Sequence, residues 1–206
     1  MKKFIAILCL VAVSTQFASC KSEAKKEPIK EVKAEKIYAY SLKKSKNDVN
    51  FVAYKTTDKV PVKGMFKTVK ITGAGEGDSI KEAINGAEFS IPVGSIETND
   101  SGRNVKIQNF FFGVMTKSKV LKGKLMLEDD TKGFAEFTMN GITEKLPFEY
   151  TIEGNSFKMN AIMNIDKWNA QAAIASLNEV CKALHAGADG VSKTWSEVAI
   201  NIVSTF

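Results

Sequence analysis

The sequence predicts a mainly β protein: a closed antiparallel barrel of about eight strands with two longer helices and one short helix. Apolar and polar residues alternate, as in residues 49–53 (VNFVA) and 62–66 (VKGMF), which is typical of antiparallel strands with one wet face. Turn residues, above all Asn140-Gly141, separate alternating segments and indicate hairpins. The last segment alternates too, so we expect it to pair with the first and to leave no free sheet edge.

A short helix and a strand are predicted between the second alternating segment and the first longer helix. Ser79 and Glu82 have the spacing of a capping box, so the short helix is expected to begin there and to end at Gly86. Residues 87–96 (AEFSIPVGSI) are predicted to form a strand in which Pro92 indicates a sheet edge or a bulge.

Residues 101–115 (SGRNVKIQNFFFGVM) are predicted to form the first longer helix. Four apolar side chains lie on one stripe at helical spacing: Ile107, Phe110, Phe111 and Val114. Three consecutive phenylalanines spread over about 200° of a helix, so they cannot all face one packed layer. We therefore expect Phe112 and Met115 to face a second apolar surface or an opening.

The rest of the domain is predicted to be a meander of four strands, a helix and a closing strand. Alternation and turn residues place the four strands at residues 118–128, 133–140, 142–153 and 156–165. Residues 168–186 are rich in alanine and are predicted to form the second longer helix, which Gly187 ends. Residues 195–206 are predicted to be the closing strand.

The N-terminus has the pattern of a bacterial lipoprotein signal peptide over residues 1–19. The apolar run Phe4–Val13 would be about 15 Å long as a helix, half the hydrocarbon core of a bilayer, so a signal segment is expected and not a membrane span. Phe17-Ala18-Ser19-Cys20 resembles a lipobox, with Phe17 where leucine is usual. We expect a lipid on Cys20; simple secretion with an unmodified cysteine is the alternative.

Residues 20–36 are predicted to be the lipidated Cys20 and a disordered tether rich in lysine and glutamate, with a partly helical tail as the alternative. Fully extended, the tether reaches roughly 55 Å. Lys21 stands where an aspartate would be linked with retention at the inner membrane. The expected location is therefore the outer membrane, facing the periplasm or the cell surface, with the barrel domain at residues 37–206.

Charge and residue usage exclude several functions. The formal net charge is +6, but residues 37–206 hold 21 basic and 19 acidic residues, so no strongly charged partner is indicated. Arg103 is the only arginine, which argues against recognition of nucleic acid. His185 is the only histidine, and Cys181 is the only cysteine after Cys20. We therefore expect no intramolecular disulfide, no cofactor and no enzymatic activity.

The domain resembles the YceI-like family of exported lipid- or polyisoprenoid-binding proteins, from about Asp48 to the C-terminus. Four stretches in a fixed order carry the resemblance: Val49-Asn50-Phe51, Val62-Lys63-Gly64-Met65-Phe66-Lys67, Ser95-Ile96-Glu97-Thr98 followed by Gly102-Arg103, and Phe137-Thr138-Met139-Asn140-Gly141-Ile142-Thr143. Asn104 stands where the family commonly has aspartate. The resemblance implies a lipocalin-like barrel whose lumen takes a long apolar chain.

A lumen that holds an isoprenoid or another long-chain lipid needs an apolar wall. Each buried methylene contributes about 0.8 kcal/mol, so a chain of about fifteen to twenty carbons offsets an association cost of about 4–15 kcal/mol. The candidate wall residues are Phe51, Phe66, Phe89, Ile91, Phe110, Phe112, Met115, Leu125, Phe137, Phe148, Met159, Met163 and Ile200. The alternative is that these side chains simply fill the core and the protein is a tethered interaction module without a ligand.

Two smaller groups of residues have candidate chemistry. Cys181, His185 and Asp189 have the spacing to share one helix face, where they could bind a metal or activate the thiol. Glycines after His185 are expected to break the helix, so a structural role is favoured and no metal is expected. Arg103 lies near a helix start and is expected to contact a ligand headgroup or to pair with a carboxylate such as Glu97.

Overall fold

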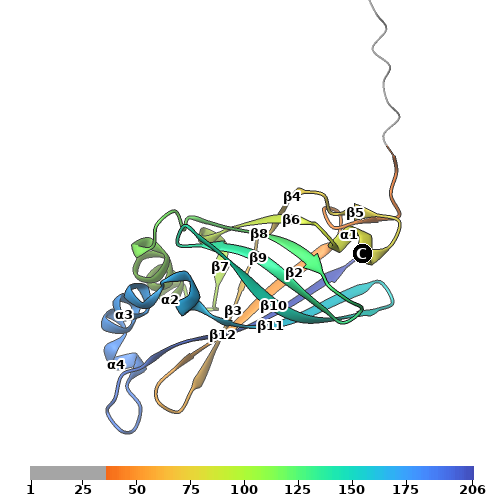
Figure 1. The fold of residues 1–206 in the computed structure, drawn as a ribbon. Helices are drawn as coiled ribbons and strands as arrows, with labels where there is room; N and C mark the ends of the chain where they lie inside the picture. The colour runs from red at the N-terminus through yellow and green to blue at the C-terminus, as the bar shows by residue number, and fades with distance from the viewer. Residues whose placement is uncertain (1–35) are drawn as a thin grey trace, which may run out of the picture. The chain divides into compact units, whose positions relative to one another are not determined.

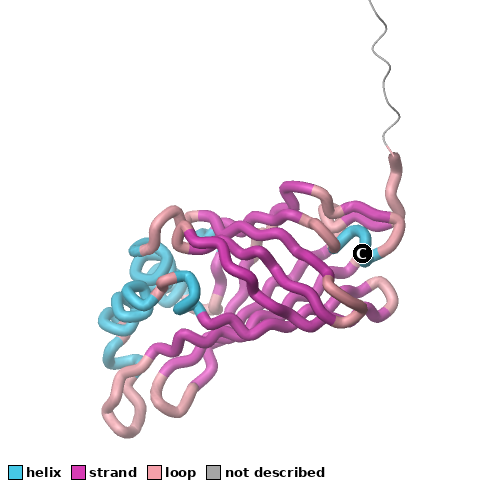
Figure 2. The backbone as a smooth tube through the Cα atoms, viewed as in Figure 1, coloured by secondary structure: helices cyan, strands magenta, loops and turns pink. Residues whose placement is uncertain are grey.

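The computed structural model describes residues 36–206, and the predicted signal peptide, Cys20 and most of the predicted tether lie outside them. The compact unit spans Ile37–Phe206. A strongly curled antiparallel sheet forms its body, and most of the helices gather at one end of that sheet (Figures 1 and 2). Within residues 36–206, no helix is both long enough and apolar enough to cross a bilayer.

The main sheet has ten strands. They are β2 (Lys46–Lys55), β3 (Val60–Phe66), β4 (Lys70–Gly73), β6 (Glu88–Pro92), β7 (Ile96–Glu97), β8 (Val120–Leu127), β9 (Lys132–Met139), β10 (Ile142–Glu153), β11 (Ser156–Asn164) and β12 (Thr194–Thr205). Their order is β4-β6-β8-β9-β10-β11-β12-β2-β3-β7. The short strands β1 (Tyr40–Ser41) and β5 (Glu76–Gly77) form a separate antiparallel pair.

The predicted meander and the pairing of the last strand with the first long one are confirmed. Strands β8 to β11 follow one another as antiparallel neighbours. Asn140 and Gly141, with φ of 51° and 73°, form the turn between β9 and β10 in the left-handed backbone region that a tight hairpin requires. In the register of β12 and β2, Ile200 lies opposite Phe51.

The sheet is a half-barrel and not the predicted closed barrel of about eight strands. The predicted strand over residues 87–96 is divided into β6 and β7, and a strand that was not predicted, β4, follows β3. The end strands of the sheet are β4 and β7. Residues 67–69 separate β3 from β4, and the 3-10 turn Val93–Ser95 separates β6 from β7 directly after Pro92, which has no N–H to donate. The Lys67 N–H still donates to the Ser95 carbonyl at 2.9 Å, which continues the pairing of β3 with β7 beyond Phe66 and Ile96.

The helices follow the predictions in position but are less regular. They are α1 (Ile80–Ile84), α2 (Ser101–Lys106), the π-helical turn Ile107–Phe111, the 3-10 turns Phe112–Val114 and Ile165–Trp168, α3 (Gln171–Val180) and α4 (Lys182–His185). The predicted helix start is confirmed, since Ser79 Oγ accepts from the Glu82 N–H at 3.2 Å, but the Glu82 carboxylate accepts from the Asp78 N–H at 2.8 Å and not from the Ser79 N–H of a complete capping box. The predicted helix over residues 168–186 is divided at Cys181.

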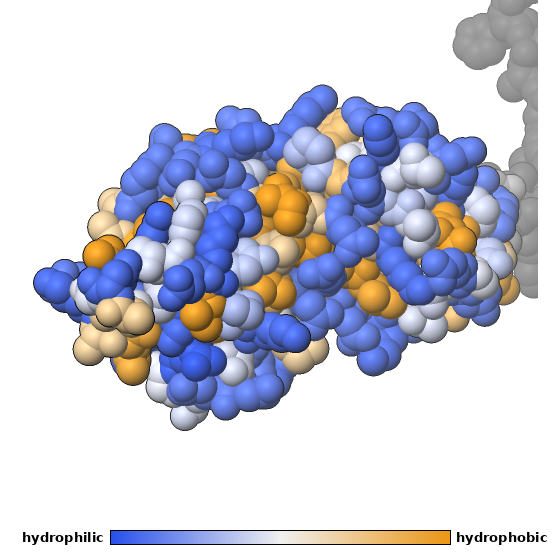
Figure 3. Space-filling model, turned by 90° about the horizontal axis from the view of Figure 1, so that it is seen from below, coloured by the Kyte–Doolittle hydropathy of each residue, from blue (hydrophilic) through white to orange (hydrophobic). Residues whose placement is uncertain are grey.

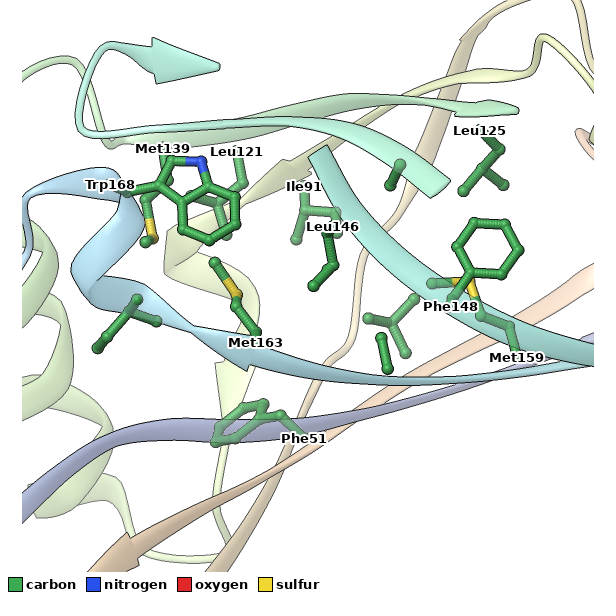
Figure 4. Packing of buried hydrophobic residues seen from close by; sticks show 14 of the residues in the cluster. Phe51, Ile91, Leu121, Leu125, Met139, Leu146, Phe148, Met159, Met163 and Trp168 are labelled. Carbon is green, nitrogen blue, oxygen red and sulfur yellow. The ribbon is translucent and has the colours of Figure 1, made fainter. Parts of the chain in front are cut away.

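The inside of the half-barrel differs along its length. Figure 4 shows Met139, Met163 and Trp168 toward one end and Leu125, Phe148 and Met159 toward the other. We call the second end, next to α1, the filled end: here Ile84, Tyr150, Phe157 and Met159 are all at most 2% exposed. The end beneath α2 and α3 is the helical end, and it contains the candidate site.

Candidate functional site

An apolar space of about 140 Å³, the inner cavity, lies inside the helical end. Six of the predicted wall residues line it: Phe51, Phe66, Phe112, Phe137, Met163 and Ile200. Period-two alternation brings these side chains inward from several strands, while Phe112 reaches the cavity from the turn that follows α2. Their aromatic rings form a connected series, in which the Phe51 and Phe66 ring centroids are 5.7 Å apart and those of Phe66 and Phe112 are 6.5 Å apart.

Gly64 shapes this wall by giving the Phe51 ring room. It lies opposite Phe51 in the register of β2 and β3. A Cβ built on Gly64 would overlap the Phe51 ring, so only glycine allows the ring to lie against the β3 backbone in its present position. The cavity surface at this point is therefore the face of an aromatic ring and not strand backbone.

The other seven predicted wall residues do not line the inner cavity. Five are buried among other core residues: Ile91, Met115, Leu125, Phe148 and Met159. Phe89 does not reach the cavity but stacks on Phe137, which does, with ring centroids 6.4 Å apart. Phe110 is 38% exposed and points away from the core. Alternation predicts which side chains face inward, but it does not predict where along the barrel the interior is empty.

The irregular helix after α2 explains why Phe110 is exposed and does not line the inner cavity as predicted. In the π-helical turn Ile107–Phe111 each turn holds one residue more than in an α-helix, and a 3-10 turn follows at once. The predicted stripe is therefore wrong in part: Ile107 and Phe111 line the cavity, whereas Phe110 and Val114 are exposed. Phe112 faces the cavity, in agreement with the expectation of a second apolar surface or an opening.

Twelve further lining residues were missed by the sequence analysis: Ala53, Ile96, Ile107, Phe111, Leu121, Met139, Ile165, Ile174, Leu177, Thr194, Trp195 and Val198. The sequence does contain a pattern for some of them. Ile174 and Leu177 lie on the apolar stripe of α3, and Val198 alternates with Ile200 on β12. Ala53 and Thr194 are small or polar, so only the fold reveals their position at the wall.

A second pocket of about 230 Å³, the mouth pocket, adjoins the inner cavity and has a basic rim. The two spaces share four lining residues: Ala53, Ile107, Leu177 and Thr194. Lys55, Arg103 and Lys106 lie on the rim, together with the half-buried His185. Burial lowers the pKa of His185, and the positive charges of the three basic side chains lower it further, so the imidazole is held toward its neutral form.

Cys181, His185 and Asp189 do not form a common site. The helix breaks between α3 and α4, and Asp189 lies in the following loop, where its carboxylate accepts from Thr57 Oγ1 at 2.8 Å and from the Val191 N–H at 3.0 Å. His185 Nδ1 is 2.7 Å from Thr194 Oγ1. No group of three metal-ligating side chains occurs among residues 36–206. Cys181 is buried and lines the mouth pocket.

Arg103 pairs with Asp100 and not with the expected Glu97. Its guanidinium is 3.5 Å from the Asp100 carboxylate and donates to the Thr98 carbonyl at 3.3 Å. Asp100 also caps α2 by accepting from the Arg103 N–H at 2.9 Å. Arg103 remains partly exposed on the rim of the mouth pocket, so it can contact a molecule that enters there.

Glu97 instead holds the start of α2 against the sheet. Its carboxylate accepts from Lys67 Nζ at 2.6 Å, from Asn104 Nδ2 at 3.0 Å and from the Asn99 N–H at 2.8 Å. These hydrogen bonds, with that from Lys67 the strongest, lower the pKa of Glu97 to about 2. Asn104 Oδ1 accepts from the Thr98 N–H at 2.9 Å, so one amide connects the helix to β7 and to the residue after it.

A curled β-sheet around an internal apolar cavity, with helices across its open end, defines a class of small binding domains. Within that class, the chain belongs to the YceI-like domain family, whose model matches residues 40–206. No curated protein matches the sequence.

Solved structures from three bacteria resemble the fold. One is a polyisoprenoid binding domain from Saccharophagus degradans implicated in plant cell wall breakdown, with a TM-score of 0.56 and 16% identity over 82% of this chain and 97% of that one. Burkholderia cenocepacia BcnA matches with a TM-score of 0.47 and 16% identity, over 78% and 96% of the two chains. The Campylobacter jejuni YCEI protein matches with a TM-score of 0.42 and 18% identity, over 68% and 84%.

Proposed function

We propose that the protein binds or carries a polyisoprenoid or another long-chain apolar lipid, with the tail in the inner cavity. The observation that carries this proposal is the inner cavity itself, an empty space whose wall is almost wholly aliphatic and aromatic and which adjoins an open mouth. Such a wall offers few groups to a polar solute and stabilises an apolar chain by removing it from water. Membership in the YceI-like family and the likeness to a polyisoprenoid binding domain support the assignment.

The volumes indicate how such a tail is accommodated. An apolar cavity of about 150 Å³ binds benzene, so the inner cavity of about 140 Å³ takes only a short part of a long chain. The adjoining mouth pocket, of about 230 Å³, takes the next part. A longer tail requires the segment that carries Ile107, Phe111 and Phe112 to move, and π-helical turns of this kind occur frequently at functional sites.

The polar end of the lipid is proposed to remain at the mouth. Lys55, Arg103 and Lys106 surround this opening and can donate hydrogen bonds to oxygen atoms of a headgroup. Arg103 is the proposed headgroup contact, because its guanidinium is partly exposed and already held in place by Asp100. This arrangement favours an amphiphile over a plain hydrocarbon.

The alternative function is a tethered interaction module with a filled core. The filled end of the half-barrel agrees with it, because Tyr150, Phe157 and Met159 are almost completely buried there. An interaction module would also be expected to expose Phe112 in a surface patch, but Phe112 is only 8% exposed and lines the inner cavity. The helical end therefore favours lipid binding.

We also propose that the protein is attached to the envelope by a lipid on Cys20, after removal of residues 1–19, and that it resides at the outer membrane. The lipobox-like sequence before Cys20 and Lys21 directly after it support this placement. The test is the intact mass of the N-terminal peptide, together with fractionation of Cys20→Ser. We expect an acylated Cys20 in the wild type and release of the variant into the soluble fraction. An unmodified N-terminal peptide in a membrane-bound protein would overturn the anchor.

Lipid binding is tested by native mass spectrometry and lipid extraction of the full-length protein expressed in a bacterial envelope. We expect one apolar chain per protein, and at least a tenfold lower occupancy in Val198→Phe, because a ring at this cavity-lining position fills the space. Met159→Leu, a change of similar volume in the filled end, is the matched control and should retain the ligand. Repeated recovery of an empty wild-type protein would contradict the proposal.

A further inference from the structure

We propose that the helical end docks onto an anionic lipid bilayer, with the mouth pocket facing the membrane. This inference rests on the proposed function, since docking would give the mouth pocket access to a lipid whose tail can enter it. The surface features that support docking are independent of any bound ligand. They are exposed apolar side chains, basic side chains and a tryptophan, all on the segments around the mouth.

The apolar side chains project from three neighbouring segments. Leu184 on α4 is 58% exposed, Val191 in the next loop is 51% exposed, and Val60 at the start of β3 is 41% exposed. The segments are held together, since Lys55 Nζ donates to the Leu184 carbonyl at 2.9 Å. Leu184 also lines the mouth pocket, so the exposed apolar surface continues into the opening. Figure 3 shows hydrophobic residues among hydrophilic ones at this end, on the left.

Trp195 lies between two lysines beside this apolar surface. Lys193 Nζ is 3.5 Å and Lys59 Nζ 4.6 Å from the centroid of its ring, and the indole N–H donates to the Thr56 carbonyl at 2.7 Å. Tryptophan and lysine together are typical of the boundary between lipid headgroups and acyl chains, because an amphipathic ring and a long basic side chain both span that boundary. Trp195 also lines the inner cavity, so it connects the docking surface with the binding space.

The charge around the mouth is complementary to anionic lipid. Each of the three segments 55–60, 100–106 and 182–193 has two basic residues and one acidic residue. Asp100 is engaged by Arg103, Glu197 pairs with Lys59 at 3.2 Å, and Asp189 accepts hydrogen bonds from Thr57 and from the Val191 N–H. Each lysine or arginine near an anionic membrane surface raises the binding constant roughly fivefold. The attraction weakens as salt is added.

The experiment measures how far Trp195 enters the bilayer. The full-length protein is mixed with vesicles of brominated phosphatidylcholine, with or without phosphatidylglycerol, and tryptophan quenching is recorded. Trp168 is fully buried and gives a constant background. We expect strong quenching only with phosphatidylglycerol, and we expect it to fall as salt rises. Equal quenching on both vesicle types, or none on either, would overturn the proposal.

Leu184→Asp and Ile162→Asp are the matched variants. Both positions are highly exposed, at 58% and 64%, so both proteins are expected to fold, but Ile162 lies on β11, away from the mouth. Leu184→Asp should lose more than half of the quenching and Ile162→Asp should retain it. Equal losses in both variants would contradict docking through the mouth. Ligand occupancy is measured on the same samples. If the protein holds a lipid but does not bind the vesicles, only the docking proposal is rejected. If it binds the vesicles but holds no lipid, only the proposed lipid binding is rejected.

Discussion

The filled end and the helical end of the half-barrel are built from the same long strands with the same alternation, yet only one of them is hollow. At the filled end, Phe148, Phe157 and Met159 are buried in one core cluster, to which α1 adds Ile84. At the helical end, Phe51, Phe66 and Phe112 surround the inner cavity. The difference arises from the covering element and not from the strands.

The two ends are closed in different ways. The short helix α1 is directly connected to the strands and packs against β8, with Ile80, Ala83 and Ile84 all buried. At the helical end, α3 packs on the π-helical turn after α2 and on β12, and the inner cavity lies beneath these helices. At the filled end, the side chains of α1 are part of the core. At the helical end, space for a ligand is left between the helices and the sheet.

The largest expected effect is the loss of an aromatic ring from the filled end. Phe157→Ala should lower the free energy of unfolding by about 3–5 kcal/mol, because Phe157 is 1% exposed and has core atoms on all sides. Phe112→Ala should cost less, since part of that ring faces empty space and gives up fewer contacts. Urea denaturation of both variants checks this, and equal losses would mean that the two ends are packed alike.

A pair of glycines gives a sharper comparison. Gly133→Ala should lower stability by about 1–3 kcal/mol, because its Cβ would meet the Met126 carbonyl oxygen and the Phe148 ring in a filled core. Gly64→Ala should cost less than about 1 kcal/mol, because the three atoms nearest to its Cβ belong to the Phe51 ring, which can move into the inner cavity.

Gly64→Ala should also reduce the occupancy of a bound lipid, since the displaced Phe51 ring takes part of its space. Thermal or urea denaturation measures the first effect and native mass spectrometry the second. If Gly64→Ala were the more destabilising of the two variants, the inner cavity could not be a space into which a ring can move.

The smallest expected effect concerns the pH dependence of stability. The pKa of Glu97 is about 2 in the folded protein, below its ordinary value of 4.5, so its hydrogen bonds stabilise the fold above about pH 4.5 and are progressively lost as the pH falls toward 2. Glu97→Gln should therefore show a weaker decrease in the urea midpoint over this pH range. An unchanged pH dependence would show that the carboxylate is not held by Lys67 and Asn104.

The sequence predicts the strands well because their determinants are local. Alternation identifies β8 to β12, and Asn140-Gly141 identifies a turn that requires positive φ. The interruptions on either side of Lys67 and Ser95 are not local in this sense. They depend on how β3 and β4 meet β6 and β7, which are distant in the sequence, so the sequence predicts a closed barrel where the structure has a half-barrel.

The candidate site is predictable only in part for the same reason. Inward direction follows from period two, which correctly places Phe51, Met163 and Ile200 in the wall. Position along the barrel depends on the covering helices, so Phe148 and Met159, equally apolar and equally inward, belong to the filled core. The predicted signal peptide, the lipid on Cys20 and the outer-membrane location remain predictions, because they concern residues outside the described chain.

The most direct test of the difference between the two ends is a crystal structure determined under xenon pressure. Xenon enters apolar cavities of about 150 Å³ without requiring a hydrogen-bond partner. We expect a xenon site among Phe51, Phe112 and Met163 and none among Tyr150, Phe157 and Met159. Xenon at the filled end, or a helical end that excludes it, would contradict the account.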